Sequence, residues 1–174
     1  MKFVYDDGGR AAAGFKGEAG DCVCRAIAIA TGKPYREVYN AMKGALREYA
    51  SAHRDRIAKR IPFAPTPRYG MPTKVYKPYL LALPWKWTPT MRIGSGCKVH
   101  LRADELPPGR LIVSVSKHLV AVVDGVIHDT HDSSRGGTRC VYGYFLPSST
   151  ETACSQGERQ WVNARTMPTG TAIT

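Results

Sequence analysis

The sequence lacks an apolar run long enough to cross a membrane. No stretch of its 174 residues approaches the roughly 18 consecutive apolar residues that a spanning helix needs. The opening residues, MKFVYDDGGR, also lack the apolar segment of a secretory signal. We therefore expect a cytoplasmic protein that does not associate with membranes.

Cysteines are few and scattered along the chain. They are Cys22, Cys24, Cys97, Cys140 and Cys154. Their number is odd and they include no pair of CxxC motifs, so we expect reduced thiols and no closed zinc site. Cys97 and His100 follow a glycine-rich stretch, but no helix start and no clear acid accompany them. We interpret that stretch as a turn into a strand rather than a nucleophile site.

Acidic residues are outnumbered, with 14 Asp and Glu against 25 Lys and Arg, for a net charge of +11. Residues 33–77 hold eleven of the cations and three of the acids. Such a segment can bind nucleic acid, an acidic protein or a membrane surface, and a solvated helix face explains it equally well. The aromatic residues between 69 and 87 alternate with lysines. They could stack on single-stranded nucleic acid, but we prefer packing of a long loop onto the core.

Length and a hydrophobic content of 43% suit one compact α+β domain over residues 1–147, with a polar, flexible tail over 148–174. Apolar spacing predicts a buried helix over 22–31, capped by Asp21 and ended by Gly32. A second helix is expected from Pro34 to about Ile61, and a short third one over 73–83 inside a proline-rich loop, 62–92. Strands are expected over residues 2–5, 92–101, 110–116, 118–123, 126–129 and 140–146.

Asp124-Gly125 between two apolar runs predicts a β-hairpin. With a two-residue loop, period-two alternation puts His118, Val120, Asp129 and His131 on one face of the sheet. Val120 would then face Asp129, and His118 would face His131. His118 and Asp129 become diagonal neighbours, roughly 7 Å apart at the backbone and within reach of each other's side chains.

Cys22 opens the first predicted helix, where the positive end of the helix dipole stabilises a thiolate. Cys24 lies about 200° further around that helix, so both thiols cannot face one base. His118 would be that base, and Asp129 would orient its ring. These residues predict a Cys-His-Asp triad of Cys22, His118 and Asp129.

The stretches that carry this pattern are Gly20-Asp-Cys22-Val-Cys-Arg-Ala-Ile-Ala-Ile-Ala, Arg110-Leu-Ile-Val-Ser-Val-Ser-Lys-His118-Leu-Val-Ala-Val-Val-Asp-Gly and Val126-Ile-His-Asp129. With these stretches in this order along the chain, the sequence resembles the papain-like cysteine peptidase superfamily. The resemblance is closest to its compact bacteriocin-processing peptidases of the double-glycine type. The resemblance covers roughly residues 18–146. It implies a buried N-terminal helix packed on an antiparallel β-sheet. It also implies hydrolysis of a protein or peptide substrate through a thioester acyl-enzyme, without a cofactor.

One element of that family's site is missing. Such peptidases usually carry a Gln shortly before the nucleophile that donates to the oxyanion, whereas residues 16–21 contain neither Gln nor Asn. Losing one such donor typically costs about 2.7–4 kcal/mol of transition-state stabilisation. The backbone N–H of Cys22 and the side chain of Lys16 are the candidate donors.

Two other functions remain open. The first is a non-catalytic module of the same fold that binds nucleic acid or an acidic protein through residues 33–77. The second is a metal-dependent hydrolase built on His128-Asp129-Thr130-His131-Asp132, which contains imidazole and carboxylate ligands. Alternation splits that cluster between two faces, and only Asp129 and His131 join His118, so we expect no resident metal.

Overall fold

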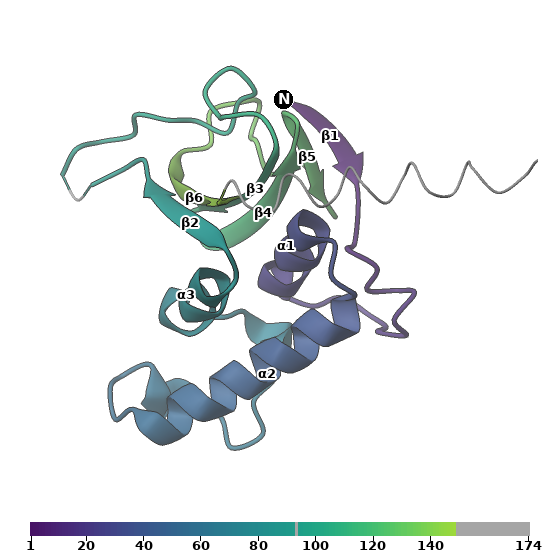
Figure 1. Cartoon of the computed structure of the whole chain (residues 1–174), viewed down its shortest axis with the longest axis vertical. Coiled ribbons are helices and arrows are strands. Elements are labelled where there is room, and N and C mark those ends of the chain that lie inside the picture. Colours follow the sequence, from purple (N-terminus) through teal and green to yellow (C-terminus); the bar gives the residue numbers. More distant parts are fainter. Residues whose placement is uncertain (93, 149–174) are drawn as a thin grey trace, which may run out of the picture.

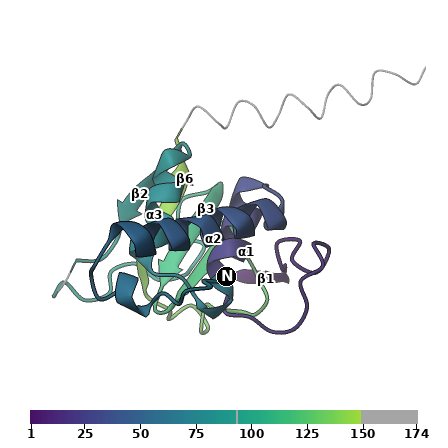
Figure 2. The same ribbon diagram turned by 90° about the horizontal axis from the view of Figure 1, so that it is seen from below.

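The structure, a computed structural model, describes residues 1–92 and 94–148. In this part of the chain three α-helices pack on a six-stranded sheet (Figures 1 and 2). The helices are α1 (Cys22–Thr31), α2 (Tyr35–Ala52) and α3 (Thr73–Ala82). The strands are β1 (Lys2–Tyr5), β2 (Trp85–Pro89), β3 (Arg110–Val115), β4 (His118–Val123), β5 (Val126–Asp129) and β6 (Val141–Pro147). Two 3-10 turns, Ala58–Arg60 and Pro67–Tyr69, lie between α2 and α3. None of the described helices is both long enough and apolar enough to span a bilayer.

The sheet has the order β1-β5-β4-β3-β6-β2. Its neighbouring strands are antiparallel except at one edge, where β1 pairs with β5 in parallel. The expectation of a purely antiparallel sheet was therefore wrong at that edge. A parallel neighbour requires a connection that runs across other elements, and a local sequence pattern cannot reveal it.

Both faces of the sheet are covered by apolar side chains. Ile112, Leu119 and Ala121 pack with α1 in one cluster, while Val113 and Val120 belong to a second cluster on the other face. This is the alternation expected along buried strands. Helix α1 is consequently enclosed between the sheet and α2 (Figure 1).

Helix α1 has the predicted bounds. Gly32 ends it in the left-handed conformation, φ 72°, and its N–H donates to the carbonyl of Ala28 at 2.8 Å. Asp21 occupies the cap position, but its carboxylate makes no capping hydrogen bond to the helix backbone. The proposed capping role was wrong, because buried cationic and phenolic groups take that carboxylate instead.

Helix α2 ends at Ala52, well before the predicted end near Ile61, and His53 is extended. The carboxylate of Asp55 accepts hydrogen bonds from the backbone N–H groups of Ile57 and Ala58 at 3.0 and 2.9 Å. A short acidic side chain that bonds nearby backbone in this way starts a new turn at the expense of the helix.

The segment between α3 and β3 differs most from expectation. Residues 85–89 were expected to belong to a proline-rich loop, but they form strand β2. This strand pairs with β6, from Trp85 opposite Pro147 to Pro89 opposite Gly143. The strand expected over 92–101 reduces, among described residues, to a single bridge between His100 and Cys140. Helix α3 and the other predicted strands are confirmed to within a residue at each end. The expected flexible tail lies, from residue 149 on, outside the described residues.

Candidate functional site

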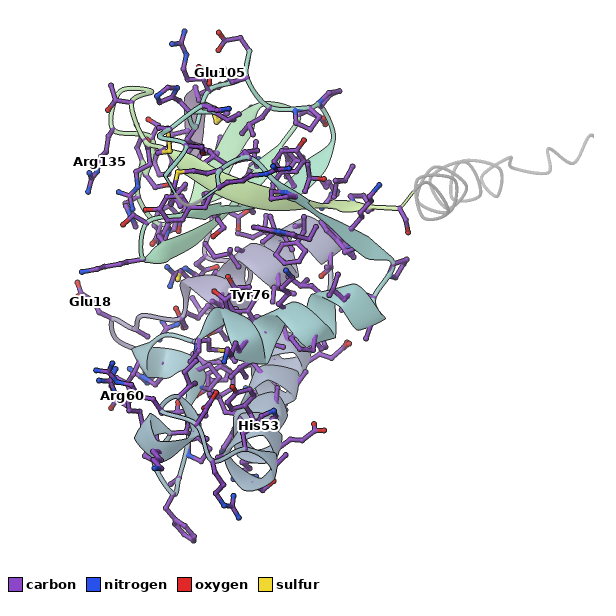
Figure 3. All side chains as sticks on the ribbon, turned by 90° about the vertical axis from the view of Figure 1, so that its left-hand side faces the viewer. Glu18, His53, Arg60, Tyr76, Glu105 and Arg135 are labelled. Carbon is purple, nitrogen blue, oxygen red and sulfur yellow. A yellow bond between two sulfur atoms is a disulfide. The ribbon has the colours of Figure 1, made fainter. Side chains whose placement is uncertain are left out.

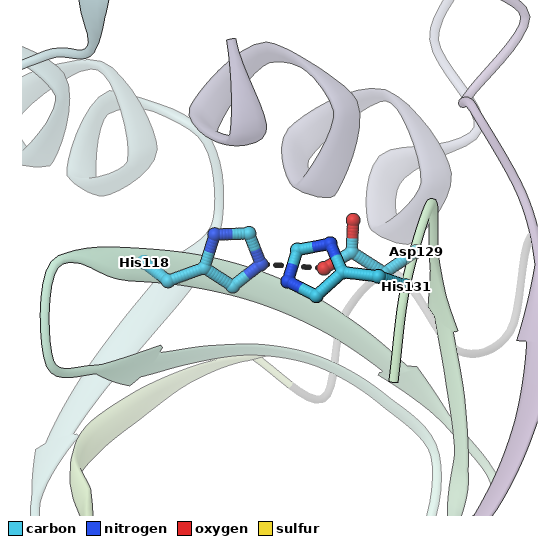
Figure 4. A group of neighbouring side chains, drawn as sticks. All are labelled: His118, Asp129 and His131. Atoms are coloured by element: carbon cyan, nitrogen blue, oxygen red, sulfur yellow. Dashed lines mark hydrogen bonds and ion pairs between the residues drawn. The ribbon is translucent and has the colours of Figure 1, made fainter. Parts of the chain in front are cut away.

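The predicted hairpin has the expected register. Val123 pairs with Val126 and Ala121 with His128, where the pairing of β4 with β5 ends. The side chain of His118 nevertheless reaches Asp129, with Nε2 2.5 Å from Oδ2. Figure 4 shows this hydrogen bond and the ring of His131 beside it. The predicted His–Asp contact therefore exists, although it lies just beyond the paired part of the hairpin.

Cys22 is the first residue of α1 and is half-buried. Burial raises the pKa of its thiol, but a hydrogen bond to His118 and the charge of that ring outweigh the burial and leave the pKa below its ordinary value. The backbone N–H of Leu119 and the charge of Arg25 act in the same direction. The thiol is thus held in an environment that favours the thiolate, the reactive form of cysteine.

Cys24 provides an internal comparison. It is fully buried in the cluster between α1 and the sheet, and this burial raises the pKa of its thiol far above the ordinary value. As the helical spacing predicted, the two thiols have different surroundings. Only Cys22 combines a lowered pKa with a place on the wall of a cleft.

His118 contacts both of the other predicted residues. Burial lowers the pKa of the ring, but the hydrogen bonds to Asp129 and Cys22 raise it to about 9. Because Nε2 donates to Asp129, Nδ1 is the nitrogen left for the thiol. The geometry supports a thiolate–imidazolium pair with Asp129 on the far side of the ring.

Asp129 is almost completely buried, with 3% of its surface exposed. Burial raises the pKa of its carboxyl, but the hydrogen bond and charge of His118, the N–H of Thr130 and the charge of Arg25 all lower it. Together they outweigh burial, and the pKa lies below its ordinary value. The Thr130 N–H donates to Oδ1 at 2.7 Å, and Nη2 of Arg25 lies 3.6 Å from the same oxygen. Asp129 is held as a carboxylate whose Oδ2 faces His118.

A buried charged network lies under this site, and the sequence analysis missed it. Arg25 also pairs with Asp21, which is 1% exposed. Asp21 additionally accepts hydrogen bonds from Nε of Arg10 at 2.7 Å and from the hydroxyl of Tyr35 at 2.5 Å. The available signal was an arginine four residues after an aspartate on an otherwise apolar helix, since a buried arginine needs anionic partners.

Cys22 and His118 line a cleft of about 1430 Å³, whereas the buried Asp129 is not part of its wall. Lys16 is exposed and lines the same cleft as Cys22, so it remains a candidate oxyanion donor alongside the Cys22 backbone N–H. The first N–H groups of a helix have no partner within that helix, which suits them to an anion. Other side chains on the walls include Arg10, Tyr69, Thr73, Lys117, His131 and Tyr142.

The other candidate features are accounted for differently. Cys97 forms a disulfide with Cys140, so the expectation of reduced thiols was wrong for this pair, and Cys97 is no nucleophile in this state. The pairing closes 43 residues of chain and has no local signature. Trp87 packs on Phe145 with ring centroids 4.7 Å apart, and Trp85 is buried, as the core-packing interpretation predicted. That interpretation was wrong for Tyr69, which is 85% exposed.

The acidic and imidazole cluster at the end of β5, residues 128–132, is split as alternation predicted. His128 turns to Asp6, with Nδ1 3.1 Å from a carboxylate oxygen, and Asp132 accepts from the N–H of Ser134. Asp129 and His131 instead join His118. The intact five-residue cluster therefore does not form one metal site.

Some of the cations of residues 33–77 form ion pairs with acidic side chains of the protein. Lys33 pairs with Glu37 and Lys74 with Asp55. Arg60 is exposed and lies at the opposite end of the molecule from Glu105 (Figure 3). The segment is not wholly separate from the candidate site, because Tyr69 and Thr73 line the cleft that Cys22 borders.

No protein-family model matches this chain, and no curated protein or solved structure matches it significantly. Function has to be inferred from the chemistry of the site.

Proposed function

We propose that this protein is a cysteine hydrolase that cleaves a peptide or isopeptide-like amide bond, with Cys22 as nucleophile. The observation that carries the proposal is the position of His118. Its ring contacts the Cys22 thiol on one side and the Asp129 carboxylate on the other, 2.5 Å from Nε2. A nucleophile, a base and a group that orients the base are the minimum of nucleophilic acyl-transfer catalysis.

The reaction then follows from the atoms present. The Cys22 sulfur attacks the carbonyl carbon and forms a C–S bond. As the C–N bond breaks, the leaving amine takes a proton from Nδ1 of His118, and a thioester remains. Water gives a proton to His118 as its oxygen attacks the thioester carbonyl, the C–S bond breaks, and the acid product leaves the thiolate–imidazolium pair restored. Asp129 orients the ring throughout.

Supports for a papain-like assignment are the helix start that carries Cys22, the strand that carries His118 and the order of the three residues along the chain. The buried α1 helix on the sheet is consistent with it. Peptide or protein is the proposed substrate class, because the cleft of about 1430 Å³ is open to solvent and has room for more than one side chain.

The test uses the two thiols of α1. Cys22→Ala should abolish labelling by a thiol-directed acyl probe, whereas Cys24→Ala should retain it, because Cys24 is fully buried. His118→Gln should slow the labelling without changing the fold. Equal labelling of both cysteine variants would show that the reactive thiol is not Cys22.

A second candidate function has its own observation. Arg54, Arg56, Lys59 and Arg60 are all exposed around the first 3-10 turn. A module that binds nucleic acid or an acidic protein would use this surface instead of the triad. A salt-dependent mobility shift with nucleic acid that survives Cys22→Ala and disappears on replacing these cations would favour it. Absence of a shift at low salt removes the nucleic-acid form of this function.

A further inference from the structure

His131 stands beside the triad but has no role in the proposed reaction. Its ring centroid lies 5.0 Å from that of His118. One ligand atom from each of His118, Asp129 and His131 lies within 4.8 Å of those of the other two. His131 is exposed and lines the cleft, whereas Asp129 is buried, so the group is reached from the side of His131. Figure 4 shows the three side chains beside one another.

Two imidazoles and one carboxylate are a common donor set for zinc and other divalent transition metals. The Oδ1 oxygen of Asp129 already accepts from the Thr130 N–H and lies 3.6 Å from Arg25. Oδ2 is the oxygen that points to His118, away from those partners. An incoming cation would therefore meet the side of the carboxylate that is not occupied by the guanidinium.

We propose that His118, Asp129 and His131 form a binding site for a divalent transition metal ion such as Zn²⁺, with the cleft supplying the open position. Binding requires the lone pair of His118 Nε2, the atom that donates to Asp129 in the metal-free protein. The metal and the His118–Asp129 hydrogen bond thus exclude one another. Cys22 contacts the ring from the other nitrogen and is not a ligand.

The metal would act as a reversible inhibitor of the triad. With Nε2 coordinated, the ring keeps its remaining proton on Nδ1 and cannot readily release it to a leaving amine. This inhibitory consequence rests on the proposed hydrolase function, whereas binding itself does not. Exposure of His131 to the cleft lets the ion enter without rearrangement of the core.

Zinc binding to Cys22→Ala, measured by titration calorimetry, tests the site without any thiolate chemistry. Zinc should still bind to this variant, because the proposed ligand set does not include the thiol. Adding His131→Gln should weaken binding at least about tenfold, since loss of even an indirect ligand partner costs that much. The matched control is His128→Gln, an imidazole three residues away that pairs with Asp6, and it should leave the affinity unchanged.

Cobalt substitution identifies the ligands directly. The Co²⁺ spectrum of the wild-type chain should lack a thiolate charge-transfer band. Such a band, loss of binding in Cys22→Ala, or equal zinc affinity in His131→Gln would each overturn the proposal. Zinc bound as expected to a protein whose Cys22 takes no acyl probe would refute the hydrolase function alone. A labelled Cys22 with no zinc binding would refute this site alone.

Discussion

Two ion pairs in this protein share the same spacing of four residues but differ in burial, and they lead to a direct test of the buried network. Arg25 and Asp21 have side chains that are 8% and 1% exposed. Lys33 and Glu37 have side chains that are 35% and 52% exposed. The spacing of the charged residues alone gives no reason to rank these pairs.

Arg25→Met keeps the bulk of the side chain and removes the cation from two buried carboxylates, Asp21 and Asp129. Removing one member of a buried pair costs about 3–5 kcal/mol, because the remaining charge is left without compensation. Asp21 retains hydrogen bonds from Arg10 and Tyr35, so we expect the lower end, about 3 kcal/mol of unfolding free energy. The comparison variant, Lys33→Met, should lose only about 0.2–1 kcal/mol, as solvated pairs do.

Urea denaturation of the three proteins at neutral pH measures both losses, with unchanged slopes as the check that the unfolded states are comparable. A loss below about 1 kcal/mol for Arg25→Met, or equal losses for the two variants, would refute the reasoning. The first result would mean that water reaches Asp21 and Asp129. The second would mean that burial does not separate these pairs.

Two further predictions concern the site and the sheet. His118 has its pKa raised from 6.5 to about 9, so its stabilising contribution is complete below pH 6.5 and is lost as pH rises through about 9. The unfolding free energies of wild type and His118→Gln, followed by urea denaturation against pH, should converge over that window, and a constant difference would contradict the shift. A Cβ on Gly143 would lie against the Trp87 ring and 2.7 Å from the Thr88 carbonyl oxygen, so Gly143→Ala should destabilise by about 1–3 kcal/mol. Gly44 lies on α2 with open space around it, so Gly44→Ala should raise the unfolding free energy by about 0.5–1 kcal/mol. Thermal melts in which Gly143→Ala and Gly44→Ala shift the melting temperature in the same direction would contradict these two predictions.

Elements with strong local signals were predictable. Helix α1 has the bounds that its apolar spacing and Gly32 indicated, and β3, β4 and β5 follow the apolar runs. The errors occurred where another group competes for the backbone or a distant strand supplies the partner. Asp55 ends α2 early by bonding nearby N–H groups, and β2 is a strand because β6 lies beside it.

The candidate site likewise combines features that follow from local sequence with features that depend on distant partners. The Asp124-Gly125 turn determines the register of β4 and β5, and that register brings His118 near Asp129 within a few residues of chain. Period-two counting also grouped Val120 with this pair. In the structure Val120 belongs to the sheet face away from α1, while His118 and Asp129 contact residues of α1.

The sequence by itself therefore determined the helix that starts at Cys22, the hairpin and the contact between His118 and Asp129, because each depends on spacing within a short segment. Only the tertiary structure decided the rest. Packing of α1 on the sheet brings Cys22 to His118, and folding buries Asp21 and Asp129 around Arg25. Those contacts join residues far apart in the chain, and their energies depend on burial, which a local pattern does not specify.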